Sequence, residues 1–150
     1  MASAPEVRAA VAGDEARWRE LWDGYLHFYH QRLDEVTIAT TWRRVLEPGS
    51  GMFCRLAVVD GTAVGFAIGV LHPGTWTAAP ICYLEDLYVE TVSRGAGVGR
   101  ALIDDVVGLA RANGWSRLYW HTEADNIAAR ALYDRFVAAD GFVRYRMFLG

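Results

Sequence analysis

Apolar and polar positions along the 150-residue chain follow helical and strand periods in turn, which predicts a fold of mixed helices and strands. The first predicted helix runs from Asp14 to about residue 30, and its aromatic residues are spaced by four, three and four positions: Trp18, Trp22, Tyr25 and Tyr29. This spacing places them on one face of an amphipathic helix. Asp14 is expected to cap the start of the helix. A second helix is predicted over residues 34–46, before the turn-rich segment 47–51.

The strands are predicted from β-rich runs that end at turn residues. A short strand over 7–11 precedes the first helix, and strands over 52–59 and 63–71 flank Asp60-Gly61, a strong hairpin signal. The remaining predicted elements are a strand over 81–89, a helix over 98–113 ended by Gly114, a strand over 116–122, a helix from Asn126 to about residue 139, and a strand over 141–149. The order is therefore β-α-α-β-β-β-α-β-α-β.

This order indicates the α/β or α+β class, with antiparallel strands early in the chain and a parallel β-α-β step between residues 81 and 122. The length and the 53% hydrophobic composition suit one compact core, so we expect a single domain over residues 1–150.

Composition and charge exclude several classes of partner. With 15 basic and 18 acidic residues, the chain lacks the basic surface that binds nucleic acid. Cys54 and Cys82 lie in apolar runs and are expected to be buried thiols, and no histidine or cysteine cluster has metal-ligand spacing, so no metal is predicted. Residues 1–6 lack the features of a signal peptide, and no apolar run reaches membrane-spanning length. We expect a cytoplasmic protein with no membrane partner.

A glycine-rich segment, Arg94-Gly95-Ala96-Gly97-Val98-Gly99, connects the predicted strand 81–89 to the following helix. Such a junction binds phosphate, because glycines let successive backbone N–H groups approach an anion at the positive start of a helix. A dinucleotide fingerprint fails, since its last glycine position is Arg100 or Leu102, and no triphosphate-binding G-x-x-x-x-G-K sequence is present.

The pattern Arg94-x-x-Gly97-x-Gly99 resembles the loop that binds the coenzyme A pyrophosphate in the GNAT acetyltransferase superfamily. The alternative is a glycine-rich helix start with a solvated Arg94. The resemblance implies a GNAT-like mixed, mostly antiparallel sheet of six to seven strands flanked by four helices. It covers most of the chain and is strongest between Tyr83 and Tyr133.

A second constellation lies on the next helix, where Asn126, Arg130 and Tyr133 share one face at spacings of four and three. From the residues alone, this is equally an N-capping asparagine with a partly buried aromatic. In the superfamily the same pattern has the asparagine contacting the coenzyme and the tyrosine lying near its sulfur, which the resemblance implies here.

The strand Tyr83–Val89 carries two adjacent acids, Glu85 and Asp86, which strand alternation sends to opposite faces, with Glu85 and Val89 on one face. It is similar to the strand of polyamine-type GNAT enzymes that supplies a general-base glutamate and a backbone amide for the thioester oxygen. A structural hydrogen-bonding role for Glu85 is the alternative. Segments 72–76, 82–89 and 119–122 look like the subgroup of fungal histone and D-amino-acid N-acetyltransferases.

The resemblance therefore implies an N-acetyltransferase that moves an acetyl group from acetyl-CoA directly to the primary amine of a small molecule, such as an amino acid or a polyamine. Glu85 and Tyr133 are the expected catalytic pair. The residues expected to contact coenzyme A are Leu87, Tyr88, Val89, Arg94, Gly95, Ala96, Gly97, Val98, Gly99, Arg100, Asn126, Arg130 and Tyr133.

Aromatic residues are the candidates for the acceptor site, because aromatic faces attract cations. These residues are Trp22, Tyr25, Tyr29, His72, Trp76 and Trp120, and core packing is the alternative for those on the first helix. Other functions stay open from the sequence: a protein or histone lysine acetyltransferase, a non-catalytic acyl-CoA sensor, and an unrelated nucleotide-binding domain. A homodimer is expected by resemblance only.

Overall fold

A computed structural model describes residues 3–150, so Met1 and Ala2 of the N-terminal segment lie outside it. The elements in chain order are β1 (Glu6–Ala9), a 3-10 turn η1 (Ala12–Asp14), α1 (Glu15–Phe28), α2 (Glu35–Leu46), β2 (Met52–Val59), β3 (Thr62–His72), β4 (Ile81–Val89), a second 3-10 turn η2 (Thr91–Ser93), α3 (Val98–Asn113), β5 (Arg117–Tyr119) and α4 (Ile127–Tyr133).

The strands form one five-stranded sheet in the order β1-β2-β3-β4-β5. Neighbours from β1 to β4 are antiparallel, whereas β4 and β5 are parallel. The predicted hairpin is confirmed, since Val59 pairs with Thr62 across Asp60 and Gly61. Both turn residues have positive φ angles, of 49° and 81°, as a two-residue hairpin of matching twist requires. The predicted mixed, mostly antiparallel class with four helices is confirmed.

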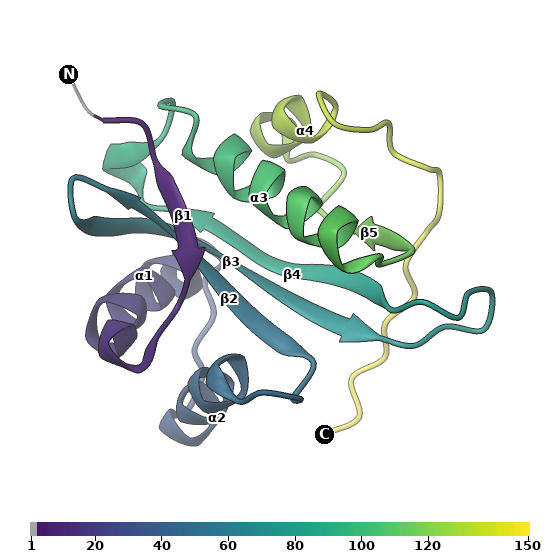
Figure 1. Cartoon of the computed structure of the whole chain (residues 1–150), viewed down its shortest axis with the longest axis horizontal. Coiled ribbons are helices and arrows are strands. Elements are labelled where there is room, and N and C mark those ends of the chain that lie inside the picture. The colour runs from purple at the N-terminus through teal and green to yellow at the C-terminus, as the bar shows by residue number, and fades with distance from the viewer. Residues whose placement is uncertain (1–2) are drawn as a thin grey trace.

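Helices cover both faces of this sheet (Figure 1), with α1 and α2 on one face and α3 and α4 on the other. On the first face, Trp18 stacks between Trp22 and Trp42, with ring centroids 5.2 and 5.0 Å apart. On the second face, Leu102, Ile103 and Val106 of α3 are fully buried against the sheet. The two hydrophobic layers fix α1 and α3 on opposite sides of β4, the strand from which the site is built.

The C-terminal part of the chain differs from the prediction. Residues 137–150 contain no strand, so the sheet has five strands rather than the expected six to seven. The segment 141–149 has a strand-like pattern, but a strand needs a hydrogen-bonding neighbour, and this segment runs past the end of the sheet as an extended tail (Figure 1, yellow). The tail exposes large side chains, such as Tyr145 at 95%.

Two neighbouring elements are shorter than predicted. β5 keeps only the three residues that pair with β4 instead of residues 116–122. α4 ends at Tyr133 rather than near residue 139, and the chain continues in a tighter turn, where the N–H groups of Arg135 and Phe136 bond to the carbonyls three positions before them. Both differences place a loop where the sequence pattern alone continued a regular element.

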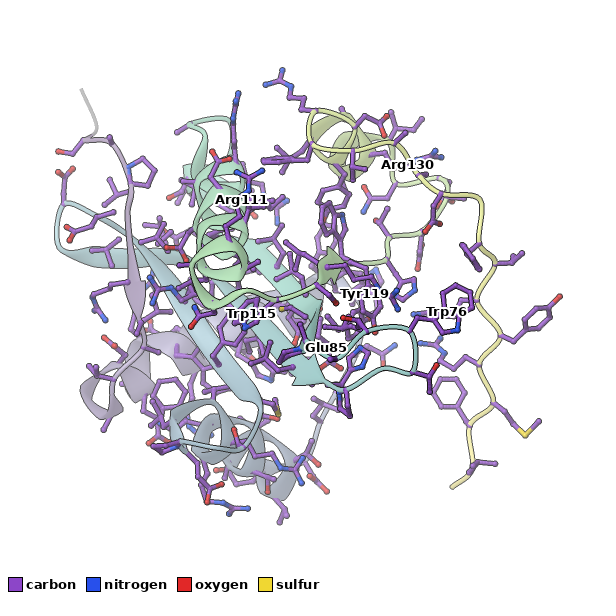
Figure 2. The ribbon with its side chains drawn as sticks, turned by 45° about the vertical axis from the view of Figure 1, so that its right-hand side comes forward. Trp76, Glu85, Arg111, Trp115, Tyr119 and Arg130 are labelled. Carbon is purple, nitrogen blue, oxygen red and sulfur yellow. The ribbon has the colours of Figure 1, made fainter. Side chains whose placement is uncertain are left out.

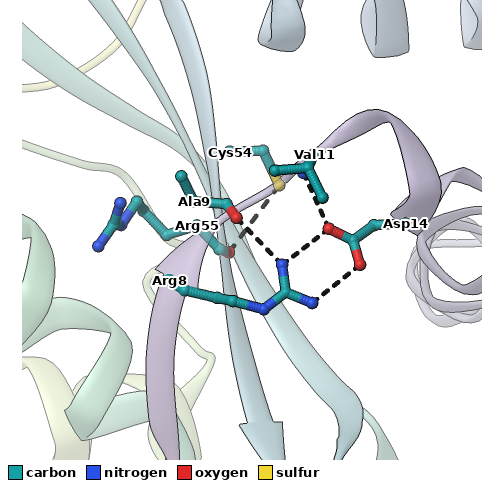
Figure 3. A network of polar contacts seen from close by, with 6 residues as sticks. All are labelled: Arg8, Ala9, Val11, Asp14, Cys54 and Arg55. Atoms are coloured by element: carbon teal, nitrogen blue, oxygen red, sulfur yellow. Dashed lines mark hydrogen bonds and ion pairs between the residues drawn. The ribbon is translucent and has the colours of Figure 1, made fainter.

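Asp14 occupies the N-cap position of α1, as predicted, but its side chain makes no capping hydrogen bond to that helix (Figure 3). Its carboxylate instead accepts two hydrogen bonds from the Arg8 guanidinium, at 2.8 and 2.9 Å, and a third from the Val11 backbone N–H. The Arg8 hydrogen bond is the main cause that lowers the pKa of Asp14. The acid joins β1 to the start of α1 rather than terminating the helix.

Both cysteines are buried and form no disulfide, which confirms their prediction as apolar thiols. Within residues 3–150, none of the helices has the length and apolar character needed to cross a membrane.

Candidate active site

The sheet opens between β4 and β5. The two strands pair only where Ile81–Tyr83 lie beside Arg117–Tyr119, although β4 continues to Val89. A β-bulge coincides with this parting: Gly69 pairs with Leu84 and Ile68 pairs with Asp86, which leaves Glu85 as the extra residue. A bulge bends its strand and interrupts side-chain alternation. The alternation that placed Glu85 and Val89 on one face therefore does not hold across it.

A cavity of about 570 Å³ lies at this opening. It is bounded by the end of α1, the end of β4, the glycine-rich loop with the start of α3, and α4. The predicted coenzyme residues that line it are Leu87, Tyr88, Val89, Arg94, Gly95, Gly97, Val98, Gly99, Arg100, Asn126 and Tyr133. The structure thus brings together segments that are more than 40 positions apart in the sequence.

The glycine loop has the backbone that an anion site needs. Gly95 and Gly97 have φ angles of +83° and +81°, and an added Cβ on either would meet no atom within 4 Å. Glycine is required there by conformation, and the space beside it is open. The first hydrogen bond of α3 runs from Ala101 N–H to the Gly97 carbonyl at 3.0 Å. The N–H groups before it have no partner within the helix and suit a pyrophosphate.

Arg94 is exposed but not simply solvated. Its Nε donates a 2.9 Å hydrogen bond to the Val89 carbonyl, and its guanidinium lies over the rings of Phe28 and Tyr88, 5.2 and 5.7 Å from their centroids. These contacts hold the arginine between α1 and β4. A positive charge is thereby fixed at the cavity, beside the open N–H groups of the loop.

On α4, Asn126 caps the helix and lines the cavity at once. Its Oδ1 accepts a 3.2 Å hydrogen bond from Ala129 N–H, so the capping alternative is confirmed without excluding a coenzyme contact through the amide nitrogen. Arg130 does not line the cavity, because its guanidinium donates to the Ala124 carbonyl at 2.8 Å. Ala96 also lies outside the lining.

Tyr133 is half-buried at the cavity wall, where its ring packs edge-on against Trp120 at 5.6 Å. Burial, with a smaller effect of Tyr29, raises the pKa of Tyr133 to about 12. The phenol therefore keeps its proton at neutral pH and is available as a hydrogen-bond donor.

The two acids of β4 have different surroundings. Glu85 is exposed and does not line the cavity. Asp86 is half-buried and accepts a 2.7 Å hydrogen bond from the hydroxyl of Tyr25, which does line it. Burial raises the pKa of Asp86 to about 7, against the lowering effect of that hydrogen bond.

The predicted acceptor residues separate into those at the cavity and those elsewhere. Tyr25 and Tyr29 line the cavity. Trp22 is 6% exposed and belongs to the core, in agreement with the alternative of core packing. Trp120 lies behind Tyr133. His72 and Trp76 are outside the lining: Nε2 of His72 lies 2.8 Å from the Tyr119 hydroxyl, and Trp76 is 93% exposed on the loop between β3 and β4 (Figure 2).

Sequence reasoning missed several lining residues. Phe28 lies three positions after Tyr25, so the helical spacing that identified the tyrosines contained a signal for it. Four of the others are small or apolar and have no chemistry of their own, namely Ala128, Ala129, Ala131 and Leu132. Ser93 and the cationic Arg135 are polar but belong to none of the motifs. No group of three or more His, Cys, Asp and Glu side chains is placed to hold a metal ion in residues 3–150.

Comparisons with known proteins agree with this geometry. Residues 15–137 match the Acetyltransferase (GNAT) family. The D-amino-acid N-acetyltransferase HPA3 of Saccharomyces cerevisiae is 32% identical over 142 residues, covering 93% of this chain and 88% of that protein. The aminoglycoside N(6')-acetyltransferase type 1 of Stenotrophomonas maltophilia is 31% identical, covering 98% of this chain and 95% of the relative.

The fold is also shared with solved structures. A ribosomal-protein-alanine N-acetyltransferase from Brucella melitensis biovar Abortus 2308 superposes with a TM-score of 0.83 at 24% identity, covering 98% of this chain and 100% of that one. The family match over most of the chain, together with the glycine loop and the cavity beside it, leads to one conclusion: the chain belongs to the GNAT family and is an acetyl-CoA-dependent N-acetyltransferase.

Proposed function

We propose that this enzyme transfers the acetyl group of acetyl-CoA directly to the primary amine of a small molecule, such as an amino acid or a polyamine. The observation that carries this proposal is the single cavity that joins the glycine loop to the tyrosines of α1 and α4. The named substrates of both relatives, D-amino acids and aminoglycosides, are small amines, which supports the acceptor class.

Donor binding is assigned to the loop and its neighbours. The N–H groups at the start of α3 and the fixed charge of Arg94 suit the pyrophosphate. Asn126 of α4 is proposed to contact the coenzyme through its free amide nitrogen. Together these contacts set the thioester at the parting of β4 and β5, next to Tyr133.

The chemistry needs a proton acceptor, because an alkyl ammonium with a pKa near ~10 must lose a proton before it attacks. A carboxylate of β4 is proposed for this role, and Glu85, acting directly or through water, is the candidate from the sequence. The Val89 N–H is proposed to stabilise negative charge on the thioester oxygen, with a contribution of about 3 kcal/mol if well aligned. No acetylated enzyme is required.

Tyr133 is proposed to donate a hydrogen bond to the sulfur and to protonate the departing thiolate. Its pKa of about 12 exceeds the ~8.5 of an ordinary thiol. Proton transfer from the phenol to the free thiolate is therefore uphill by itself, and it is completed when the phenol regains the second proton of the attacking nitrogen.

Release of free thiol from acetyl-CoA across a panel of acceptors tests the function. The panel contains D- and L-amino acids, polyamines, an aminoglycoside and a lysine-rich peptide, and we expect turnover with a small amine. Turnover with the peptide alone would instead identify a protein acetyltransferase, and acetyl-CoA binding without turnover would identify a sensor. Replacing Tyr133 with Phe is expected to lower kcat, and an unchanged kcat assigns the tyrosine to packing.

A homodimer is also proposed, supported by the apolar side chains that the C-terminal tail leaves exposed. The cytoplasmic location expected from the sequence stays a prediction.

A further inference from the structure

A phenol at the cavity wall is hydrogen-bonded to a half-buried carboxylate. Tyr25 of α1 lines the cavity, and its hydroxyl donates a 2.7 Å hydrogen bond to Oδ1 of Asp86 on β4. Asp86 itself does not line the cavity. A molecule held there lies against Tyr25, whose hydroxyl group is hydrogen-bonded to this carboxylate.

The bulge explains why this acid faces α1. Asp86 pairs with Ile68, which belongs to the hydrophobic layer under α1 and α2. Without the extra residue Glu85, strand alternation would turn Asp86 towards α3. The fold therefore places a polar carboxyl in an otherwise apolar layer, where its direct hydrogen-bond donor is a cavity-lining phenol.

No cation neutralises this carboxyl. Asp86 shares an influence on pKa with five titratable groups: Tyr25 and Tyr29 of α1, Cys54 of β2, and Tyr83 and Glu85 of β4. Within residues 3–150, no arginine, lysine or histidine lies within salt-bridge distance of it. The carboxyl is thus free to change its charge when a proton arrives, without breaking an ion pair.

We propose that Tyr25 and Asp86 form a proton relay that deprotonates the acceptor amine. The inference rests on the proposed function and assigns the proton acceptor within it. The ammonium gives one proton to the Tyr25 oxygen while the Tyr25 hydroxyl proton passes to Oδ1 of Asp86. The N–H bond and the original Tyr25 O–H bond break, while one new O–H bond forms at Tyr25 and one at Asp86, so the ammonium becomes an amine and the carboxylate becomes a carboxylic acid.

Tyr25 stays neutral throughout this transfer. Burial and the nearby Asp86 raise its pKa far above the ordinary value, so a free phenolate does not form. The phenol passes a proton only by receiving one at the same time. After acetyl transfer, Asp86 returns its proton through Tyr25 to water, and the second proton of the attacking nitrogen leaves with the thiol.

With Asp86 as the proton acceptor, Glu85 has a different role. Glu85 is exposed and outside the lining, so its charge acts on the approach of a cationic acceptor and not as the proton acceptor. The burial that raises the pKa of Asp86 to about 7 places its change of charge in the neutral range, which suits a proton acceptor at that pH.

The test measures kcat/KM for the acceptor between pH 5.5 and 8.5 in the wild type, Asp86→Asn, Tyr25→Phe, their double variant, and Glu85→Gln as the matched neighbouring acid. At pH 8.5 we expect Asp86→Asn to lower kcat/KM by about 100-fold. The defect should shrink towards pH 5.5, where the wild type also holds a proton on Asp86. Tyr25→Phe should give a similar loss, and the double variant should be no worse than the poorer single variant, because the pair acts as a unit.

Three outcomes contradict the relay. The loss of kcat/KM in Asp86→Asn could be equal at pH 5.5 and 8.5, or Tyr25→Phe could be fully active. Alternatively, Glu85→Gln alone could remove the fall of kcat/KM at low pH. An unchanged Kd for acetyl-CoA shows that each variant is folded. If Asp86→Asn does not fold, the Tyr25→Phe variant alone tests the relay. A wild type that turns over no amine contradicts the proposed function itself, whereas wild-type turnover with unimpaired variants contradicts the relay alone.

Discussion

Gly24 lies within α1 at the point where the helix crosses Tyr88 of β4. A Cβ at position 24 would lie 2.5 Å from the Tyr88 hydroxyl. Tyr88 in turn lines the cavity and lies under the guanidinium of Arg94. The absence of one methyl group therefore helps to position the arginine of the phosphate site.

Replacing Gly24 with Ala is expected to displace Tyr88 and to destabilise the protein by about 1–2 kcal/mol, because overpacking outweighs the better helix propensity of alanine. The Kd for acetyl-CoA should rise as Arg94 loses its support. Urea unfolding and calorimetry measure the two effects. Gly108→Ala is the matched control, since no atom lies within 4 Å of its Cβ position in α3. This control should gain about 0.5–1 kcal/mol, and equal effects in both variants would contradict the steric explanation.

The half-buried Asp86 also makes stability depend on pH. Burial raises its pKa to about 7, whereas the carboxyl of an unfolded chain ionises near ~3.9. Between these values the folded protein keeps a proton that the unfolded chain has lost, so stability falls as the pH rises through this window. Asp86→Asn should therefore gain stability relative to the wild type as the pH rises from 5 to 8, by at most about 2.7 kcal/mol.

Urea unfolding at the two pH values measures this change. Asp104→Asn is a suitable control, because that carboxylate is 59% exposed and its stability difference should not change with pH. A difference for Asp86→Asn that is the same at pH 5 and pH 8 would show that burial does not perturb the acid.

At the scale of elements, β2 and α3 are joined by a half-buried ion pair. Arg55 donates from Nε and Nη2 to the two oxygens of Asp105, at 2.8 and 3.0 Å. Their side chains are 19% and 18% exposed, and two-point pairs of this kind are stronger than single contacts. The pair fixes the far half of α3 on the sheet while its start faces the cavity.

A double-mutant cycle with Arg55→Met and Asp105→Asn is expected to give a coupling energy of about 1–2 kcal/mol in urea unfolding. The exposed pair Arg100–Asp104 on α3, with a 3.8 Å contact, is the matched comparison and should couple by less than about 0.5 kcal/mol. Coupling energies of equal size in both pairs would show that burial adds nothing to the contact.

Elements with a strong period were predictable from the sequence. The aromatic stripe located α1, the hairpin at Asp60-Gly61 located β2 and β3, and the loop from Arg94 to Gly99 located the start of α3. Each signal is local, since it depends on neighbouring positions along the chain. The segments of the cavity wall were identified for the same reason.

Features that depend on contacts between distant segments were not predictable. The bulge at Glu85 arises from pairing with β3, and it moves Asp86 to the face of Tyr25. The Asp14 carboxylate accepts hydrogen bonds from Arg8, which lies across a turn, and not from the N–H groups of the helix that it precedes. The final segment has the pattern of a strand, but nothing in that pattern shows whether a neighbouring strand is present.

At the scale of the whole molecule, the C-terminal tail leaves a series of apolar side chains uncovered. Phe142, Tyr145, Met147 and Leu149 are all more than 80% exposed. Apolar surface of this extent is typical of an interface, and the free edge of a sheet is a site for pairing with a second chain.

Light scattering after gel filtration is expected to give twice the 16.7 kDa of one chain. The double variant Tyr145→Ser, Met147→Ser should shift the mass towards the monomer by removing apolar contact area. Val36→Ser is the control, because Val36 is 74% exposed on α2, away from the tail, and should leave the mass unchanged. A monomeric wild type, or a variant that still dimerises fully, would contradict a dimer formed through the tail.

The separation of β4 from β5 leaves the sheet incomplete beside its last strand. Beyond Tyr83, one side of β4 has no neighbouring strand, although main-chain amides and carbonyls continue to Val89. Such groups need partners, which an extended molecule with amide groups would supply by lying along this side of β4. Amide hydrogens on this side of β4 should exchange quickly with solvent in the free enzyme and slowly once a linear, amide-containing donor is docked. The amide groups of the donor would then form the hydrogen bonds with β4 that a neighbouring strand would otherwise form.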